Sequence, residues 1–378
     1  MAVFTALTRE DITGFLAHHS LGELVAYEGI ATGIENTNYF VDTTTGRFVL
    51  TVFERLTFRQ LPFYLELMRH LARRMLPVPE PQENRSGSLL SELRGKPAAI
   101  VTRVEGVAVE RPTVEQCARI GALLARMHLE ARDFPHFQPN LRGIGWWKTV
   151  LPQLERFVDD ATYHFLAEEV IFQDSFHRSP VYETLPQGPV HGDLFRDNVL
   201  WQGGPESTRV GGVIDFYFAG CTTWLYDLAV TINDWGVDLA DGAFDMPRAR
   251  ALMNAYHAVR PLTPQEREVW RATLRGAALR AAHAAHDQRC RGAVLAQEGA
   301  APRRAFRQHG KVAGVPELRV GAPGREAGGE HGLLRRHRGI GARARSEIDR
   351  AAVVGIDQRE VHRFATLVDV GHAGQRAG

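Results

Sequence analysis

The first hundred residues alternate between short apolar runs and polar turn residues, which is the pattern of antiparallel strands. Clusters of Gly, Asn and Thr separate the early runs, and such clusters favour the turns of hairpins. We therefore predict an antiparallel sheet near the N-terminus. Its expected strands cover residues 24–31, 39–41, 47–53, 88–93 and 98–104.

One stretch among these strands has helical periodicity instead. Apolar residues recur every three or four positions over 58–75. Three prolines within 76–81 should end that helix, because proline lacks the backbone donor and restricts the residue before it. After a short hinge at 104–106 the pattern becomes mainly helical, beginning with Thr113-Val-Glu-Gln116, which resembles a capping box.

Three short strand-like segments interrupt the later helices, at 189–190, 198–201 and 211–216. The length of 378 residues suits two structural units or one large bilobal one. The sequence thus predicts an α+β fold with two lobes. Residues 1–104 would form a small lobe around an antiparallel sheet, and residues 105–280 a larger helical lobe.

Residues 281–378 have a different composition. Of these 98 residues, 50 are Ala, Gly or Arg and two are aromatic, so the segment is poorly equipped to offset its ordering entropy. It carries a net charge of +7, whereas the first 280 residues carry −6. We expect a disordered tail or the out-of-frame translation of a GC-rich gene. A nucleic-acid-binding tail is not favoured, because no aromatic platform accompanies the arginines.

Cysteine usage and hydropathy bear on the compartment. The three cysteines, Cys117, Cys221 and Cys290, lie far apart without metal-site spacing, which favours a reducing cytoplasm. No apolar stretch approaches the ~20 residues that span a bilayer, and the N-terminus lacks the pattern of a secretory signal. We therefore expect a cytoplasmic protein with no membrane partner.

The segment His191-Gly-Asp-Leu-Phe-Arg-Asp-Asn198 carries the strongest chemical signal. Phosphoryl transfer needs a carboxylate that orients the attacking hydroxyl and acceptors that hold Mg²⁺. Asp193 and Asn198 have the five-residue spacing of a kinase catalytic loop. Asp215 follows an apolar strand and begins Asp-Phe-Tyr, the place of a metal-binding Asp.

Each of these residues also has an ordinary explanation. A lone Asp-Asn pair is usually a turn or a helix cap, and an Asp after Val-Ile usually ends a strand. The combination is much rarer than its parts, so it favours an ATP-dependent small-molecule kinase. Within it, His191 more often packs and hydrogen-bonds the loop than performs chemistry.

The wider context of these motifs resembles a known family. The stretch 188–201 is similar to the catalytic loop of the aminoglycoside phosphotransferase and choline kinase superfamily. The stretches 33–39, 48–54, 213–219, 224–230 and 233–235 resemble bacterial homoserine kinases of the protein-kinase-like type. This resemblance covers about residues 1–280. It implies a protein-kinase-like fold and ATP-dependent phosphorylation of the L-homoserine hydroxyl in threonine biosynthesis.

The resemblance also implies roles for individual residues. Asp193 would be the base, and Asn198 and Asp215 would bind Mg²⁺. Asp227 would brace the catalytic loop with His191. The loop over the phosphates of ATP would be formed by Gly33, Asn36, Thr37 and Asn38, whose residue types permit turns that aim backbone amides at an anion.

The resemblance leaves two binding roles without an assigned residue. Thr51 stands where a general kinase carries a phosphate-binding Lys, and Arg55 and Arg103 are candidates for the replacement cation. Homoserine also needs partners for its ammonium and carboxylate groups. The candidates are Arg196, Tyr217, Asn233 and Asp234, although the last two could equally cap a helix.

Two other functions fit the same motifs. The first is a kinase of the superfamily that acts on choline, a sugar or an aminoglycoside. The second is an inactive nucleotide-binding product, in which the unusual last quarter of the chain fails to support the site. The sequence does not indicate an oligomeric state.

Overall fold

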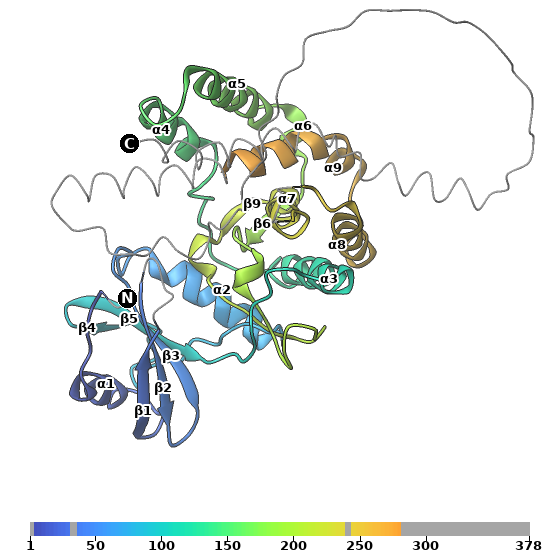
Figure 1. The fold of residues 1–378 in the computed structure, drawn as a ribbon. Helices are drawn as coiled ribbons and strands as arrows, with labels where there is room; N and C mark the ends of the chain where they lie inside the picture. The colour runs from blue at the N-terminus through green and yellow to red at the C-terminus, as the bar shows by residue number, and fades with distance from the viewer. Residues whose placement is uncertain (1–3, 31–35, 239–242, 281–378) are drawn as a thin grey trace, which may run out of the picture.

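The computed structural model describes residues 4–30, 36–238 and 243–280, which form two lobes (Figure 1). A five-stranded antiparallel sheet with two helices makes the small lobe, and the larger lobe is mainly helical. The predicted α+β bilobal fold is therefore confirmed. Gly33 and the compositionally distinct segment 281–378 lie outside the described residues.

The strands of the small lobe follow the order β1-β2-β3-β5-β4. The predicted strands are present, with their ends shifted by a few residues. All neighbouring strands pair antiparallel, with Asn38 opposite Thr51 and Thr51 opposite Ala99. The five strands are β1 (Leu24–Gly29), β2 (Thr37–Thr43), β3 (Arg47–Val52), β4 (Ser91–Leu93) and β5 (Lys96–Thr102).

Each face of this sheet packs on one helix, because successive side chains of a strand point to opposite faces. Helix α1 (Arg9–Leu16) buries Ile12 and Phe15 in a cluster with Leu50 and Ile100. Helix α2 (Leu61–Arg73) packs on the other face in the main core, which holds Phe53. Alternate residues of β3 therefore face opposite ways, one set toward α1 and the other toward the interior between the lobes.

The hinge between the lobes runs beside a strand of the large lobe. Val107 and Trp201 exchange two backbone hydrogen bonds of 3.1 and 2.9 Å. Gly106 lies so close that an added Cβ would meet the Trp201 backbone at 2.8 Å, and its φ is +148°. Only glycine fits this crossing without strain.

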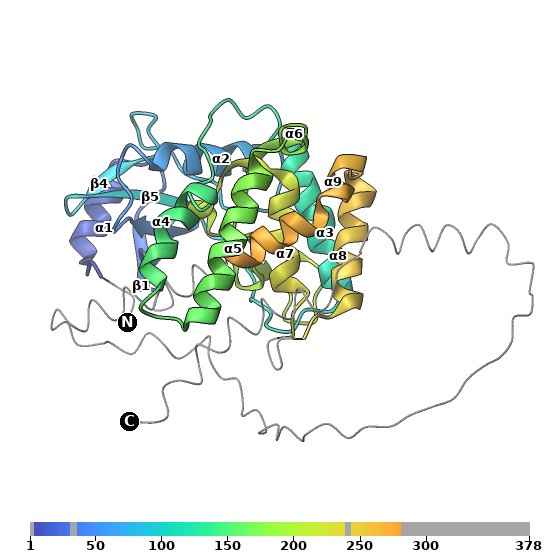
Figure 2. The same ribbon diagram turned by 90° about the horizontal axis from the view of Figure 1, so that it is seen from above.

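The helices of the large lobe lie side by side away from the sheet (Figure 2). The predicted capping box of α3 is present, with Thr113 and Gln116 each bonded to the other's backbone. A helical segment at 270–280 follows α9. The labelled helices are α3 (Val114–Glu130), α4 (Ile144–Leu154), α5 (Asp160–His177), α6 (Pro180–Glu183), α7 (Trp224–Trp235), α8 (Met246–Val259) and α9 (Pro264–Glu268).

Two short antiparallel ladders interrupt these helices, three of whose strands lie near the predicted segments, whereas β9 was not predicted and the segment expected at 211–216 ends at Val213. Strand β6 (Gln187–Val190) pairs with β9 (Gly220–Thr223), and β7 (Val199–Trp201) pairs with β8 (Val210–Val213). The loop 191–198 joins β6 to β7, and Asp215 lies between β8 and β9. These ladders therefore bring both chemical motifs to one place.

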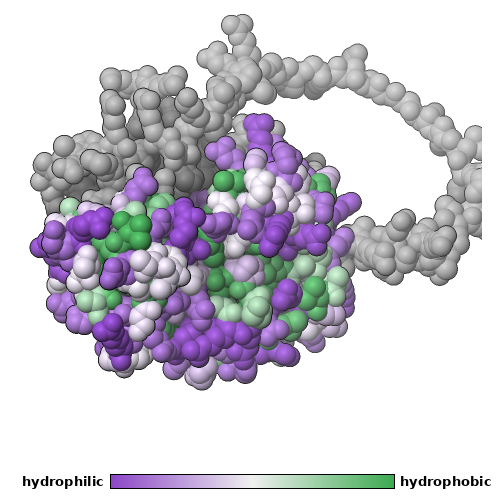
Figure 3. All heavy atoms as spheres, turned by 90° about the horizontal axis from the view of Figure 1, so that it is seen from below, coloured by the Kyte–Doolittle hydropathy of each residue, from purple (hydrophilic) through white to green (hydrophobic). Residues whose placement is uncertain are grey.

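None of the described helices combines the length and apolarity that crossing a membrane requires. On the face shown in Figure 3, hydrophilic residues form most of the surface and apolar residues gather in smaller patches.

Candidate active site

The loop between β6 and β7 holds Asp193 at the centre of the site. Its side chain is mostly buried, with a relative exposure of 9% for the residue. The Asn198 Nδ2 atom donates to the Asp193 carbonyl oxygen at 2.8 Å and lies 3.3 Å from Asp193 Oδ2. The five-residue spacing thus closes the loop on itself and fixes the carboxylate.

Asp215 is brought beside Asn198 by the pairing of β7 with β8. Val199 lies opposite Val213, and the Ile214 N–H donates to the Asn198 carbonyl at 2.9 Å. Asp215 itself is exposed and has left-handed backbone angles, φ 64° and ψ 65°. Such a conformation is uncommon for a residue other than glycine and occurs often at functional sites.

These two residues present oxygen ligands of the kind that Mg²⁺ prefers. The Asn198 amide nitrogen is used by Asp193, which leaves the amide oxygen as the end that can bind a cation. Mg²⁺ usually takes one or two side-chain ligands and completes its shell with water and phosphate. The donor set of Asn198 and Asp215 therefore fits such an ion.

His191 uses both ring nitrogens within the loop. Its Nε2 donates to the Ile214 carbonyl at 3.0 Å, and its Nδ1 accepts the Asp193 N–H at 3.2 Å. Burial lowers the pKa of His191, so the neutral ring with this tautomer is favoured. Both ring nitrogens are occupied in linking the catalytic loop to the strand before Asp215.

Asp227 lies beneath the loop and is fully buried on α7. Its Oδ2 accepts the His191 N–H at 2.9 Å and its Oδ1 accepts the Gly192 N–H at 2.8 Å. Burial by itself would raise the pKa of Asp227, but the hydrogen bonds from His128 and the loop N–H groups outweigh it, so the pKa is lowered. The ionised carboxylate thus satisfies two backbone donors that would otherwise be buried unpaired.

His128 was not identified from the sequence. It lies in the last turn of α3, where its Nε2 is 3.0 Å from Asp227 Oδ2 and its Nδ1 is 2.8 Å from the Tyr256 hydroxyl. Burial lowers the pKa of His128 in spite of the carboxylate beside it. Tyr256, His128 and Asp227 thus form a chain of hydrogen-bonded side chains beneath the loop. They come from three different helices, α8, α3 and α7.

Gly192 takes a conformation that other residues rarely adopt. Its φ is +74°, and an added Cβ would lie 2.7 Å from the Phe218 carbonyl oxygen. The loop therefore approaches the 3-10 turn Phe216–Phe218 more closely than any side chain would permit.

Arg280 is a second site residue that the sequence analysis missed. Its Nη2 donates to Asp193 Oδ1 at 2.6 Å, and the residue is only 5% exposed. Burial would lower the pKa of Arg280, but Asp193 outweighs it and the pKa is raised. No local pattern marks this residue, because it is 87 positions away from its partner.

Two predicted substrate ligands pair with each other instead of facing an open site. The Asp234 carboxylate accepts from the Arg196 backbone N–H at 2.8 Å and from its Nε at 3.1 Å. The remaining guanidinium nitrogens donate to carbonyls of Glu110, Asp234 and Val237. All the nitrogens of the Arg196 side chain are thus bonded within the protein and tie the loop to α7 and to the segments around it, while the substrate roles expected of Arg196 and Asp234 stay predictions.

The other two candidates lie in different places. Asn233 donates through Nδ2 to the Leu274 carbonyl at 3.1 Å, and so ties α7 to the segment 270–280. Tyr217 packs edge-on against Phe53 and Tyr64, at the contact between the lobes. Burial raises the pKa of Tyr217, the nearby Asp215 adds to this, and a hydrogen bond with Thr51 opposes it.

The predicted phosphate loop divides between the two faces of the sheet. The Asn38 Oδ1 accepts from the Thr51 hydroxyl at 2.7 Å, on the face toward Tyr217. Thr37 lies one position earlier, so its hydroxyl points to the α1 face and donates to Glu54 Oε1 at 2.6 Å. The Thr37 side chain therefore faces away from Tyr217, and the expected contact of this loop with the nucleotide through its backbone amides stays a prediction.

Asn36 and the candidate cations complete the small-lobe side of the site. The Asn36 Oδ1 lies 3.4 Å from the Glu54 N–H, at the start of β2. Arg103 stacks on the Phe40 ring with its guanidinium carbon 3.9 Å from the ring centroid, and Arg55 is exposed. Neither arginine is fixed beside Thr51 by a hydrogen bond to it among the described residues.

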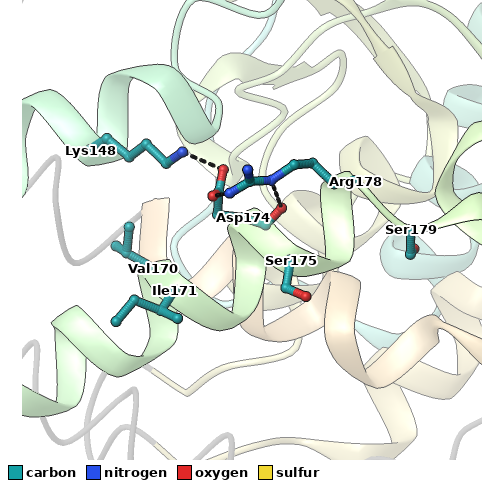
Figure 4. A pocket seen from close by; sticks show the side chains of 7 residues that line it. All are labelled: Lys148, Val170, Ile171, Asp174, Ser175, Arg178 and Ser179. Atoms are coloured by element: carbon teal, nitrogen blue, oxygen red, sulfur yellow. Dashed lines mark hydrogen bonds and ion pairs between the residues drawn. The ribbon is translucent and has the colours of Figure 1, made fainter.

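A hollow of about 600 Å³ lies between α4 and α5 and contains none of these residues. Figure 4 shows Lys148 and Arg178 both reaching Asp174, with Val170 and Ile171 at the other end. The hollow is therefore a surface feature of two paired cations and two apolar side chains, separate from the loop that bears Asp193.

The sheet lobe is joined by a hinge to a lobe whose loop holds the buried Asp193 and, five residues on, Asn198, and Asp215 follows the hairpin of β7 and β8. These features together define a protein-kinase-like phosphotransferase. Residues 26–262 match the model of the phosphotransferase enzyme family. The chain belongs to this family, and its relatives at about half identity are homoserine kinases.

Two of these relatives illustrate the likeness. Homoserine kinase of Paraburkholderia xenovorans (strain LB400) is 49% identical over 284 residues, which are 74% of this chain and 86% of the relative. Homoserine kinase of Burkholderia multivorans (strain ATCC 17616 / 249) is 52% identical over the same shares.

Solved structures support the fold. Amicoumacin kinase hAmiN, in complex with AMP-PNP and Ca²⁺, has a TM-score of 0.60 at 13% identity and covers 75% of this chain and 87% of its own. Choline kinase from Cryptosporidium parvum Iowa II has a TM-score of 0.55 at 14% identity, with 79% and 99% covered. At these identities the likeness shows a shared kinase fold.

Proposed function

We propose that this enzyme transfers the terminal phosphoryl group of ATP to the hydroxyl of L-homoserine, giving O-phospho-L-homoserine and ADP in threonine biosynthesis. The observation that carries the proposal is the close likeness to homoserine kinases over most of the chain, combined with the loop that presents Asp193. The lobe boundary would fall at the hinge, with residues 1–104 covering ATP and residues 105–280 binding the acceptor.

Asp193 would act as the base. Its carboxylate is fixed by Asn198 and by the loop, so it can orient the attacking hydroxyl before the proton leaves. The hydroxyl oxygen forms a bond to the γ-phosphorus, the bond from that phosphorus to the bridging oxygen breaks, and the hydroxyl proton passes to Asp193. Holding the hydroxyl in line with the phosphorus supplies much of the rate enhancement in this class of reaction.

Asn198 and Asp215 would hold Mg²⁺ against the phosphates. When bound, the ion neutralises the charge that builds on the transferring group and the leaving ADP. The protein's own contribution is positional, since the pairing of β7 with β8 keeps the two ligands adjacent. His191 and Asp227 would maintain the loop geometry without contacting the reactants.

On the small-lobe side, the segment that includes Gly33, Asn36 and Asn38 would lie over the phosphates of ATP through its backbone amides. Thr51 offers no charge there, and its hydroxyl is already bonded to Asn38. The phosphates would therefore depend more heavily on the metal and on backbone N–H groups than in a kinase with a strand lysine.

The test is an ADP-release assay of the full chain with ATP, Mg²⁺ and a panel of acceptors: L-homoserine, choline, a hexose and an aminoglycoside. We expect turnover with L-homoserine, with phosphate attached to the side-chain oxygen by mass spectrometry. Turnover with another acceptor and none with homoserine would replace the proposal with a different kinase of the superfamily. ATP binding without turnover of any acceptor, by a protein with a cooperative thermal melt, would indicate an inactive product.

A further inference from the structure

Arg280 occupies an unusual position for a buried arginine, because its ion-pair partner is the presumptive base itself. The Nη2 atom donates to Asp193 Oδ1 at 2.6 Å, and the Arg280 side chain is only 6% exposed. Burying a guanidinium is costly, and an ion pair in such a place is often no more stabilising than a well-packed apolar pair. A structural role alone therefore gives a weak reason for this charge.

The surroundings of Arg280 form a partial lining for a small ligand. The guanidinium carbon lies 5.5 Å from the ring centroid of Phe195 and 5.7 Å from that of Phe218. A second guanidinium, that of Arg142, lies 5.3 Å from the same Phe218 ring. Two guanidinium groups therefore lie beside one aromatic ring close to Asp193.

A buried hydroxyl adds a further polar group to the same place. Among the described residues, the Tyr226 hydroxyl is buried and meets no partner at full hydrogen-bond geometry, although the Asn140 side chain is near enough to interact with it. Burial raises the pKa of Tyr226, while Arg280 and Asn140 oppose that rise. A buried donor that is not fully satisfied is costly, so a ligand oxygen that accepts from it would be favoured.

Two other arginines of this region, Arg196 and Arg275, are committed elsewhere. All the nitrogens of Arg196 bond to Asp234 and to backbone carbonyls, as described above. Arg275, on the same helical segment as Arg280, pairs with Glu169 of α5. Arg280 is thus the arginine that the structure places within hydrogen-bond distance of the base.

We propose that Arg280 binds the α-carboxylate of the amino-acid acceptor, and that its contact with Asp193 is exchanged for the substrate carboxylate when the acceptor enters. The inference rests on the proposed function, since it takes the acceptor to be homoserine. Three carbon atoms separate the hydroxyl oxygen of homoserine from its carboxylate carbon. An acceptor whose hydroxyl lies on Asp193 therefore has its carboxylate within reach of the long Arg280 side chain.

The exchange has a chemical benefit. While Arg280 donates to Asp193 Oδ1, that oxygen is already engaged by the guanidinium and is less available to accept from the hydroxyl of an acceptor. Moving Arg280 onto the substrate carboxylate frees Asp193 for the hydroxyl only when an amino acid occupies the site. A planar guanidinium suits a carboxylate in particular, because it can donate two parallel hydrogen bonds. Acceptors without a carboxylate, such as choline, would lack this contact.

The experiment compares the full-length wild-type protein with Arg280→Met and Arg280→Lys, using L-homoserine and 3-amino-1-propanol. The second acceptor has the same hydroxyl and amine but no carboxylate. We expect Arg280→Met to lower kcat/KM for homoserine by about 10- to 100-fold, the value of a charge-assisted hydrogen bond, with KM for ATP unchanged. Its kcat/KM for 3-amino-1-propanol should fall far less, and Arg280→Lys should be intermediate on homoserine.

The ratio of the two acceptors, measured on one preparation, does not depend on the fraction of folded protein. Calorimetric titration of homoserine into protein with a non-hydrolysable ATP analogue gives a second measure, and should show the same loss of affinity in Arg280→Met. Arg271→Met, an exposed position on the same helical segment, is the matched control and should leave the ratio unchanged.

Unchanged homoserine affinity in Arg280→Met would overturn the proposal. So would an equal loss with both acceptors, which would mean that Arg280 acts on Asp193 or on the phosphoryl group. A wild-type protein that neither binds nor phosphorylates homoserine would overturn the proposed function first and this inference with it, before any variant is compared.

Discussion

His128 and Asp227 bind each other with 3.0 Å between Nε2 and Oδ2, although they come from α3 and α7 and are 99 positions apart. Neither residue is hydrogen-bonded to Asp193. Asp227 instead accepts the backbone N–H groups of His191 and Gly192, the two residues that precede Asp193. The position of the base therefore depends on the packing of helices that carry no reacting group.

The first prediction concerns Asp227→Asn. The amide keeps the size of the carboxylate but replaces one acceptor with a donor that faces buried donors. We expect the free energy of unfolding to fall by about 3 kcal/mol, because a buried charged hydrogen-bond network loses one partner. The measurement is urea unfolding, with kcat expected to fall as well.

Asp160→Asn on the exposed first turn of α5 is the control, and surface substitutions of this kind usually change stability by about 0.5 kcal/mol or less. If Asp227→Asn is no more destabilising than this control, the network does not hold the loop.

The second prediction concerns pH. Burial lowers the folded-state pKa of His128 and His191, so protonation below the unfolded value of about 6.5 favours the unfolded chain. The folded pKa of Asp227 is also lowered, and its contribution is present above about pH 4 and lost as the pH falls through the folded pKa. All three effects make stability fall on acidification, first below about pH 6.5 and more steeply below about pH 4.

Urea unfolding between about pH 8 and pH 4 measures this dependence. His128→Asn should flatten the segment between about pH 7.5 and pH 5.5, whereas the exposed His164→Asn should not. A stability that rises as the pH falls through this range would contradict the assignment of neutral, buried histidines.

The third prediction separates backbone strain from steric clash. Gly192 and Gly95 share a φ of +74°, but an added Cβ meets the Phe218 carbonyl oxygen at 2.7 Å only in the first. Gly95→Ala should cost about 1–2 kcal/mol with kcat unchanged, which is the usual penalty of left-handed backbone. Gly192→Ala should cost more and should also lower kcat, because the loop must shift.

Unfolding by urea and steady-state kinetics on both variants check this prediction. Equal destabilisation of the two, with full activity in Gly192→Ala, would show that the loop tolerates the displacement.

The fourth prediction concerns Asp193→Ala. Removal of a positioned base should lower kcat by about 10²- to 10⁴-fold. Affinity for ATP, measured by calorimetry, should change little, because the carboxylate faces the acceptor. A variant with near-wild-type kcat would remove Asp193 from its role.

The fifth prediction concerns the metal. Asp215→Asn removes a charged ligand, so the Mg²⁺ concentration that gives half-maximal rate should rise at least about tenfold. Magnesium titration of the rate at saturating ATP measures this shift. An unchanged midpoint would show that Asp215 does not bind the ion, and an exposed carboxylate such as Asp160 replaced by Asn should leave it unchanged.

Local patterns predicted the elements whose cause is local. The apolar period over 58–75 gave α2, observed at Leu61–Arg73, and Thr113 with Gln116 gave the start of α3. Helix α1 was missed, although Thr8 and Asp11 form a capping box at its start. Its eight residues are too few for the apolar period to stand out.

Contacts between distant segments could not be read in the same way. Arg196 and Asp234 are 38 positions apart, and nothing in the spacing says that they satisfy each other. Arg280 meets Asp193 only because the segment 270–280 folds back onto the catalytic loop. Thr37 is different, since strand alternation relative to Thr51 would have placed its side chain on the α1 face.

Thr51 has a consequence for chemical proteomics. ATP-site probes that report on kinases commonly acylate the lysine of the third strand, and this chain has threonine there. Its three lysines are Lys96, which pairs with Glu54 on the α1 face, Lys148, which pairs with Asp174 on α5, and Lys311. A probe or inhibitor that must react with a third-strand lysine would consequently find no amine at that position in this enzyme.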